Sequence, residues 1–340
     1  MKKKLLIHIG YPKTGTTSLQ EEIFVKLHNS GKINFLGRTI KSSHAKYGRK
    51  KFRGKDWVWD LRQYLFAGKK LKVNNSVIKP NILNVMSDED LTFHDFFHFI
   101  QFGKHVNHYN LPNKLKEIIG ENVEVNIMIT LRNQVDLIYS SYLQKCKIVR
   151  TYLGDYSFND FLKNKANYSN RSADEHLKLY DFNIIAEFWE SSFKTNLQVL
   201  LFEDFVEDKS VFFSKLSRIL PANENELKSL LGTKHYRKKD KTRLFNSSYY
   251  KKLKGLGKII GLFLGELNFL RFLERRYHMR NNFYLGFEKK VLIKHISVKI
   301  DKPSSAENEY IRDFFNESNL DFAKSHNLDL QKLKKYNYIK

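Results

Sequence analysis

Residues 5–19 read LLIHIGYPKTGTTSL, and this stretch decides how the rest of the chain is interpreted. It opens with a short, mostly apolar run, which is typical of a buried strand. A turn of glycine, proline, lysine and hydroxyl residues follows at 10–17, and apolar residues then recur at helical spacing at Leu19, Ile23 and Leu27. A strand, a glycine-containing loop and a helix direct backbone N–H groups and the positive end of the helix toward one point. The stretch therefore predicts an anion-binding loop in an α/β fold.

The position of the lysine distinguishes this loop from that of nucleoside-triphosphate enzymes. In a P-loop, the lysine directly follows the second glycine, and a Ser or Thr that holds magnesium comes next. Here Gly10 and Gly15 keep the P-loop separation, but Thr16 occupies the lysine position and the lysine lies inside the loop, at Lys13. A cation at Lys13 still reaches the terminal group of a bound nucleotide. The arrangement disfavours a P-loop kinase or NTPase, which is the alternative enzyme class.

Two motifs together carry a family resemblance. Residues 12–19, PKTGTTSL, resemble the 5′-phosphosulfate-binding loop of sulfotransferases that use 3′-phosphoadenosine 5′-phosphosulfate (PAPS). Apolar residues alternate over 123–131 and stop at Arg132, and Ser140 follows eight residues later, as in the 3′-phosphate motif of that family. An arginine suits a phosphate because its fork donates two parallel charged hydrogen bonds. Gln134 replaces a proline that is frequent in the family, which leaves the contact residues in place. The chain thus resembles a bacterial, carbohydrate-type PAPS-dependent sulfotransferase.

The resemblance implies a role for each matched residue. Lys13 would bind the donor and act in catalysis, because a cation there meets the charge that grows on the leaving phosphate. The 5′-phosphate would be held through main-chain N–H and hydroxyl groups of Thr14, Gly15, Thr16, Thr17 and Ser18, and the 3′-phosphate by Arg132 and Ser140. Adenosine 3′,5′-bisphosphate would be the product, and no metal is expected because the leaving group is good. The expected acceptor is a hydroxyl or amine of a glycan or glycolipid precursor.

The proton acceptor is sought at the end of another predicted strand. Residues 82–86 are mostly apolar and run into SDED at 87–90. Ligands of open α/β sheets bind at the carboxyl ends of strands, although Ser87 can also cap a helix that has an acidic first turn. The family uses a glutamate or a histidine as the base. Glu89 is therefore the first candidate, Asp88 the second and His44 the third.

Composition narrows the class of partner. The chain of 340 residues carries 60 Lys and Arg against 36 Asp and Glu, a net charge of +24, which favours anionic partners. No nucleic-acid-binding motif is recognised, so no specific nucleic acid partner is expected. The non-enzyme alternative is a basic protein that binds nucleic acid or membrane surfaces, with a steep dependence on salt and no nucleotide specificity. The chain has a single cysteine, Cys146, and its apolar start is interpreted as a strand rather than a signal peptide. Both features predict a cytoplasmic protein, and a location at the inner face of the membrane stays an alternative.

Two later segments carry less specific signals. LLFEDF, residues 200–205, resembles a strand and turn of the same family, in which Glu203 and Asp204 are expected to cap a helix or pair with a basic residue. Residues 232–246 are densely basic, and either form a solvated charge run or add contacts to the 3′-phosphate. The candidates for such contacts are Lys234, Arg237, Lys238 and Arg243.

The chain is expected to form a single domain, 1–340, with a P-loop-type central parallel sheet flanked by helices. Residues 1–245 would be the nucleotide-binding α/β core and 246–340 a helical C-terminal extension. Residues 249–279 are apolar on one face and flanked by Lys and Arg. They predict a helix that packs on the core or, alternatively, lies on an anionic membrane.

Overall fold

A computed structural model describes most of the chain. The described residues are 2–37, 57–66, 68, 75–92, 108–153, 156–165, 172–231, 248–253, 293–298 and 301–340. His44, the basic candidates within 232–246 and the segment 254–279 lie outside them, so the predictions for these residues stay predictions.

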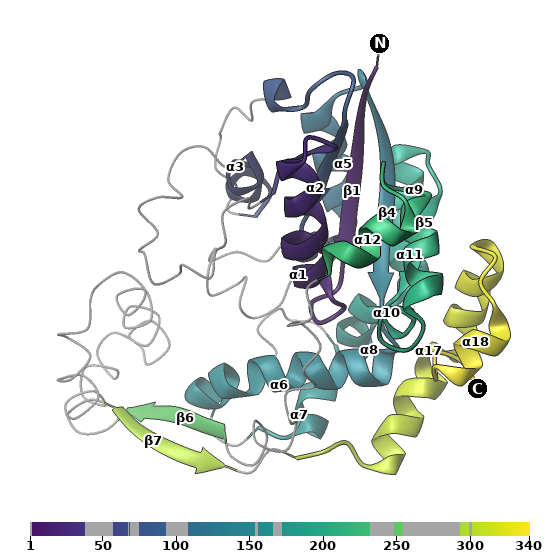
Figure 1. Ribbon diagram of the computed structural model, residues 1–340. Coiled ribbons are helices and arrows are strands. Elements are labelled where there is room, and N and C mark those ends of the chain that lie inside the picture. The colour runs from purple at the N-terminus through teal and green to yellow at the C-terminus, as the bar shows by residue number, and fades with distance from the viewer. Residues whose placement is uncertain are drawn as a thin grey trace.

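Five parallel strands form the central sheet, as predicted (Figure 1). Their order is β2-β3-β1-β4-β5, so β1 lies in the centre between β3 and β4. The bounds are β1 Lys3–Gly10, β2 Ile33–Phe35, β3 Leu83–Ser87, β4 Val123–Leu131 and β5 Leu197–Leu201. The register places His8 beside Ser87 on one side and Gly10 beside Thr130 on the other. Because all pairs are parallel, the carboxyl ends of the strands share one edge of the sheet.

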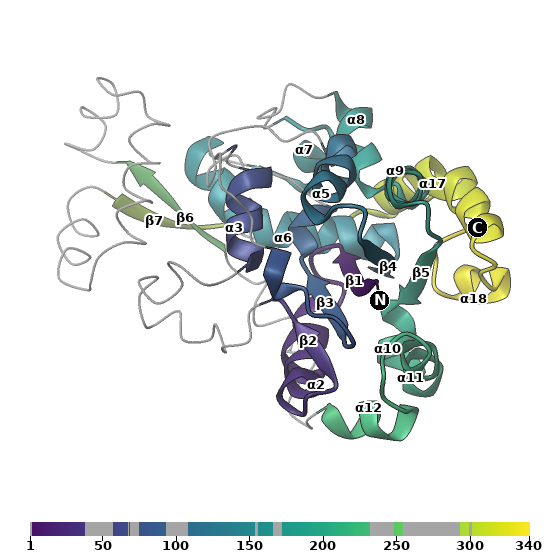
Figure 2. The same ribbon diagram turned by 90° about the horizontal axis from the view of Figure 1, so that it is seen from above.

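Helices cover both faces of the sheet (Figure 2). Side chains alternate between faces along a strand, so Leu6 and Met128 pack toward one layer, and Ile7 and Ile127 toward the other. The first layer holds the helix after the loop, made of α1 Thr16–Ser18, a π-helical segment Leu19–Phe24 and α2 Val25–Asn29, together with α10 Phe202–Glu207, α11 Lys209–Ser217 and α12 Glu224–Leu230. The second layer contains α5 Leu111–Ile119 and α9 Phe182–Phe193.

The remaining helices lie around this sandwich. Helix α6, Gln134–Leu153, crosses below the carboxyl edge of the sheet in the view of Figure 1. The others are α3 Trp57–Leu65, α7 Phe158–Leu162, α8 Ala173–Leu177, α17 Ser305–Ser325 and α18 Leu330–Lys335. Short 3-10 turns occupy Asn75–Val77, Glu89–Leu91, His108–Asn110 and Lys178–Tyr180. Within the described ranges, no helix is long and apolar enough to cross a bilayer.

The C-terminal part differs from a purely helical extension. Its helices are present, and α17 contributes Ile311 and Phe315 to the main core. However, β6 Ser248–Leu253 and β7 Ile293–Val298 form an antiparallel pair, so the helix expected from residue 249 onward is wrong for 249–253. Adjacent tyrosines favour a strand, and Ile293–Val298 supplies a partner rich in β-branched residues. Pairing between distant segments therefore overrides the local helical pattern. The division at residue 245 stays a prediction.

Candidate active site

The ends of β1, β3 and β4 bring the predicted site residues to one edge of the sheet. The loop at 10–17 follows β1, the 3-10 turn Glu89–Leu91 follows β3, and Arg132 follows β4. Because these three strands are neighbours, the three segments meet above α6, at the lower end of the sheet in Figure 1. This is the edge at which open α/β sheets bind ligands.

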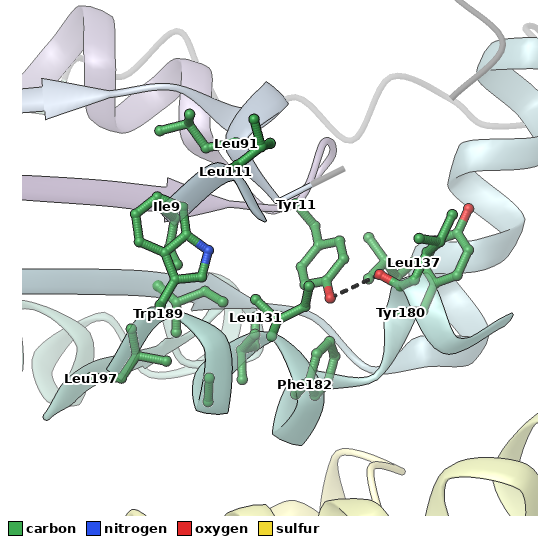
Figure 3. Close-up of a cluster of buried hydrophobic side chains, with 14 of the residues drawn as sticks. Ile9, Tyr11, Leu91, Leu111, Leu131, Leu137, Tyr180, Phe182, Trp189 and Leu197 are labelled. Atoms are coloured by element: carbon green, nitrogen blue, oxygen red, sulfur yellow. Dashed lines mark hydrogen bonds between the residues drawn. The ribbon is translucent and has the colours of Figure 1, made fainter. Parts of the chain in front are cut away.

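Buried groups of the core hold the loop in its conformation. Thr14 Oγ1 donates to the Tyr11 carbonyl at 2.7 Å. Tyr11 is buried, and its hydroxyl donates to the Leu179 carbonyl at 3.1 Å, the dashed line in Figure 3. Its ring also stacks on Tyr180, with 6.2 Å between ring centroids. The start of the loop is thus anchored to the layer that contains α9.

Two residues of the loop have left-handed backbone conformations. Gly15 has a φ of 81° and caps α1, and Lys13 has a φ of 72°. A Cβ atom at Gly15 would lie 3.3 Å from the ring of Phe202, so both its conformation and its surroundings favour glycine. For a lysine, this conformation carries a cost, and such strain is found where the surrounding structure demands it.

The first helix after the loop begins with backbone N–H donors that the helix itself does not use. The N–H groups of Thr16, Thr17 and Ser18 are the first three of their helix, so they have no partner within it. Lys13 and Thr17 are exposed and Ser18 is half-buried. The hydroxyls of Thr14 and Thr16, in contrast, are engaged within the protein. Among the residues predicted to bind the 5′-phosphate, Thr14 and Thr16 therefore offer their backbone rather than their side chains.

Glu89 lies directly against this loop. Thr16 Oγ1 donates to Glu89 Oε2 at 2.6 Å, a contact between residues 73 positions apart. Burial raises the pKa of Glu89, and the charges of Asp90 and Asp88 add to this, whereas the hydrogen bond from Thr16 opposes it. A half-buried carboxylate with a raised pKa beside an anion-binding loop has the properties of a general base.

Asp88, the second candidate base, is engaged in an ion pair. Arg62 binds both of its carboxylate oxygens, with Nε 2.7 Å from Oδ2, and Arg62 Nη2 also lies 2.7 Å from Asp90 Oδ2. Asp88 is buried and caps the turn that carries Glu89, by accepting from the Asp90 N–H at 3.1 Å. The cap is therefore Asp88 and not Ser87, because the Ser87 hydroxyl is used in a different network. This arrangement favours Glu89 over Asp88 as the proton acceptor.

Arg132 faces the loop from the end of β4. Its Nη1 donates to the Lys13 carbonyl at 3.3 Å, and its Nη2 lies 3.2 Å from Asp136 Oδ2. The guanidinium also lies over the ring of Phe202, 5.2 Å from the centroid. Ser140 is half-buried and lies two turns into α6. Phe202 thus contacts both Gly15 and Arg132, which sequence reasoning missed.

A second feature that sequence reasoning missed is a buried polar network beneath the loop. His8 Nδ1 is 2.7 Å from Ser87 Oγ and His8 Nε2 is 3.0 Å from Thr130 Oγ1. Gln20 Nε2 donates to the same Ser87 hydroxyl at 3.0 Å. The network links β1, β3, β4 and the helix after the loop. A histidine inside an apolar strand run, immediately before the loop, is the signal that could have revealed it.

His8 is expected to make the protein sensitive to acid. Burial lowers the pKa of His8 to about 3, so His8 takes up a proton near pH 6.5 only in the unfolded chain. Its contribution to the free energy of unfolding is complete above that value and falls by about 1.4 kcal/mol per pH unit as the pH drops toward 3. In urea denaturation, the advantage of the wild type over His8→Gln should shrink by about 2 kcal/mol between pH 7 and pH 5. Parallel pH profiles for the two proteins would contradict this role.

Glu203 and Asp204 both have structural partners. Asp204 is fully buried, 2.6 Å from Lys332 Nζ, and accepts from the Tyr336 hydroxyl at 3.2 Å. Glu203 Oε1 accepts from the Asn133 N–H at 3.0 Å, just before α6. The pairing predicted for Asp204 with a basic residue is confirmed. In the part of the chain that the structure describes, no group of three or more His, Cys, Asp or Glu residues is arranged to hold a metal ion.

Some solved structures are similar to this chain, at low sequence identity. No curated protein sequence matches the chain significantly. A solved sulfotransferase from Alicyclobacillus acidocaldarius is 13% identical, with 97% of this chain and 98% of that chain covered and a TM-score of 0.46. Two structures of retinol dehydratase, one with androsterone and the inactive cofactor PAP and one with retinol and PAP, are each 14% identical with a TM-score of 0.32. The match to the first includes 71% of this chain and 69% of the retinol dehydratase chain. The match to the second includes 98% of this chain and 80% of the retinol dehydratase chain.

A family model provides the assignment. The model described as "Sulfotransferase domain" matches residues 3–259. The match spans well over half of the chain and includes the loop after β1, Glu89 and Arg132. The chain therefore belongs to the sulfotransferase domain family and is an enzyme that transfers a sulfuryl group.

Proposed function

We propose that this enzyme transfers a sulfuryl group from PAPS to a hydroxyl or amine of a glycan or glycolipid precursor and releases adenosine 3′,5′-bisphosphate. The observation that carries the proposal is the contact between Arg132 and the Lys13 carbonyl, at 3.3 Å. Through it, a guanidinium lies beside an anion-binding loop on the neighbouring strand. Two adjacent cationic sites match a nucleotide that carries a phosphate at each end of its ribose.

The loop after β1 would hold the 5′-phosphosulfate group. The N–H groups at residues 16–18, which have no partner within their helix, and the positive end of the helix favour an anion there. The exposed side chains of Lys13 and Thr17 and the half-buried Ser18 can close around it. Arg132 and Ser140 would hold the 3′-phosphate, which distinguishes PAPS from a donor that lacks this group.

Glu89 would accept the proton of the acceptor hydroxyl. In the transfer, the acceptor oxygen forms a bond to sulfur while the bond from sulfur to the 5′-phosphate oxygen breaks. The proton passes to the Glu89 carboxylate, and the electron pair of the broken bond stays on the phosphate. Lys13 stabilises the charge that develops on this phosphate, in a site where preformed donors need no rearrangement.

Two features of the chain support the acceptor class. The family resemblance favours a carbohydrate, and the net charge of +24 favours an acceptor or precursor that is itself anionic. Such a charge also raises the encounter rate with an anionic donor at low ionic strength.

Incubation with PAPS carrying radioactive sulfur and a panel of neutral and acidic oligosaccharides tests the acceptor directly. Transfer to none of them, with transfer to a non-carbohydrate hydroxyl compound, would exclude this acceptor class.

Calorimetry with three nucleotides tests the donor. The wild type should bind adenosine 3′,5′-bisphosphate more tightly than AMP, and ATP poorly with or without magnesium. Arg132→Ala should weaken the binding of the bisphosphate about 10- to 100-fold, because charged hydrogen bonds are lost, and leave AMP nearly unchanged. Arg132→Lys, which keeps the charge but loses the fork, should fall between them. Equal losses for AMP and the bisphosphate would contradict the assignment of the 3′-phosphate site.

A further inference from the structure

The junction that carries Arg132 has little support from regular structure. Strand β4 ends at Leu131 and helix α6 begins at Gln134, so Arg132 and Asn133 lie between them. The strand pairing ends at Leu131, and the helix holds this junction only through the Asn133 carbonyl, which accepts from the Leu137 N–H at 2.9 Å. Other groups must hold Arg132 in the direction of the loop.

A first link to this junction comes from the C-terminal segment, which is the part of the chain from α17 to residue 340. The Tyr338 hydroxyl donates to Glu203 Oε2 at 2.7 Å, and Glu203 Oε1 accepts from the backbone and side-chain N–H groups of Asn133 at 3.0 and 3.1 Å. Burial and the carboxylate of Glu203 raise the pKa of Tyr338, so its hydroxyl stays protonated and donates. Three successive side chains thus connect the C-terminal segment to the residue after Arg132.

A second link reaches the next residue along. Gln134 and Asn319 exchange two amide hydrogen bonds, at 2.8 and 3.0 Å. Asn319 Nδ2 also donates to the Tyr338 carbonyl at 2.7 Å, which joins the two links. Asn319 belongs to α17, which packs against α6 and α9 (Figure 1). Asn133, Gln134 and Asn319 are all buried, so a broken bond would leave a polar group without water.

The first link continues to the guanidinium itself. Asn133 Oδ1 accepts from the Asp136 N–H at 3.0 Å, and thereby caps α6. Asp136 in turn pairs with Arg132 Nη2 at 3.2 Å. The orientation of Asn133 therefore determines the direction of the backbone after Arg132. It also determines the position of the Asp136 carboxylate, which holds the Arg132 side chain.

We propose that the C-terminal segment, through Tyr338 and Asn319, positions Arg132 and so sets the preference of the enzyme for a nucleotide with a 3′-phosphate. The inference rests on the proposed function, because it takes Arg132 as the ligand of that phosphate. Tyr338 is a positioning residue, since it acts through Glu203 and Asn133.

A pair of tyrosine variants tests the proposal. Tyr338→Phe removes the hydroxyl that holds Glu203, and Tyr336→Phe removes a similar hydroxyl from the same segment that donates to Asp204 instead. Calorimetry with adenosine 3′,5′-bisphosphate and with AMP gives the preference for the 3′-phosphate as a ratio of affinities. Tyr338→Phe should lower this ratio about 3- to 30-fold with little change in the affinity for AMP, because Tyr338 and Arg132 belong to one hydrogen-bond network. Tyr336→Phe should leave the ratio unchanged. In the Arg132→Ala background, Tyr338→Phe should have no further effect.

Several outcomes would overturn the proposal. An equal loss of affinity for the two nucleotides, or in the two tyrosine variants, would show a general structural effect. An effect of Tyr338→Phe that stays undiminished in the Arg132→Ala background would show the same. If Tyr338→Phe does not fold, Gln134→Met cuts the second link, and an unchanged ratio in that variant overturns the proposal. A wild type with no preference for the bisphosphate over AMP would instead contradict the proposed function.

Discussion

Replacement of Glu89 by glutamine is expected to lower kcat by about 10²–10⁴ while the enzyme still binds adenosine 3′,5′-bisphosphate. Glutamine keeps the size of the side chain and an oxygen that accepts from Thr16, so the loop keeps its contact. It cannot take up the proton of the acceptor hydroxyl. Turnover measured with saturating donor, together with calorimetry of the product nucleotide, separates the two effects. Unchanged turnover would remove the assignment of Glu89 as the base.

The same substitution should stabilise the fold at neutral pH. Burial raises the pKa of Glu89 above its value in the unfolded chain, so ionisation costs more in the folded protein. The contribution of Glu89 to stability is therefore complete below the ordinary glutamate pKa and is lost as the pH rises through the raised value. The Tm of Glu89→Gln should exceed that of the wild type at pH 7, with a smaller difference near pH 4. A residue with a purely structural role would show the opposite change in Tm.

A neighbouring carboxylate provides the control for Glu89. Asp90 lies in the same turn and pairs with Arg62, and its charge raises the pKa of Glu89. Asp90→Asn should retain most of the turnover. Because a base must be ionised to act, kcat falls as the pH drops through the pKa of Glu89, and this acid limb should move to lower pH in Asp90→Asn. An acid limb that does not move would indicate that another group controls the rate.

Removal of the Lys13 side chain is expected to lower kcat by about 10²–10³, the usual cost of losing one preorganised group that stabilises charge in the transition state. Glycine is the informative substitution because the backbone of Lys13 has a φ of 72°, a conformation that glycine adopts freely. Lys13→Gly therefore removes the ammonium group without forcing the loop into a new shape. Its Tm should stay close to that of the wild type, and its turnover is measured with the standard transfer assay.

Lys194 offers a matched control for this experiment. Lys194 also has a positive φ, 53°, and ends α9 just before the start of β5. It therefore lies at the amino edge of the sheet, opposite the site. Lys194→Gly makes the same chemical change at a similar backbone conformation and should leave kcat unchanged. Comparable losses in both variants would indicate that lysine removal acts through the general charge of the protein.

The strands and the loop could be predicted because their signals are local. Apolar runs marked β1, β3 and β4, and the glycine and hydroxyl residues after the first strand marked the loop. Arg132 was predicted at the end of its strand because the alternation over 123–131 stops there, and the structure confirms this location. The roles of these residues in binding stay predictions that the experiments above address.

Contacts between distant segments could not be predicted in the same way. The ranking of Glu89 above Asp88 gains support from Arg62, which lies 26 positions before Asp88 and binds both of its oxygens. The strand at residues 248–253 forms because a partner at 293–298 is available, although its own sequence continued into a helical pattern. In both cases, the deciding group is far away in the chain and carries no mark of its partner.

The sequence by itself determined a parallel α/β sheet, an anion-binding loop at its centre and an arginine on the next strand. These follow from residue periodicity and turn chemistry, which act over a few neighbouring residues. Only the tertiary structure decided how the site is oriented. It placed the Glu89 carboxylate on the Thr16 hydroxyl, the Phe202 ring in contact with Gly15 and Arg132, and the Tyr338 hydroxyl on Glu203, which binds Asn133. The physical reason is that hydrogen bonds and ring contacts depend on which surfaces the packed layers bring together, and Gln134 and Asn319, 185 positions apart, make such bonds here.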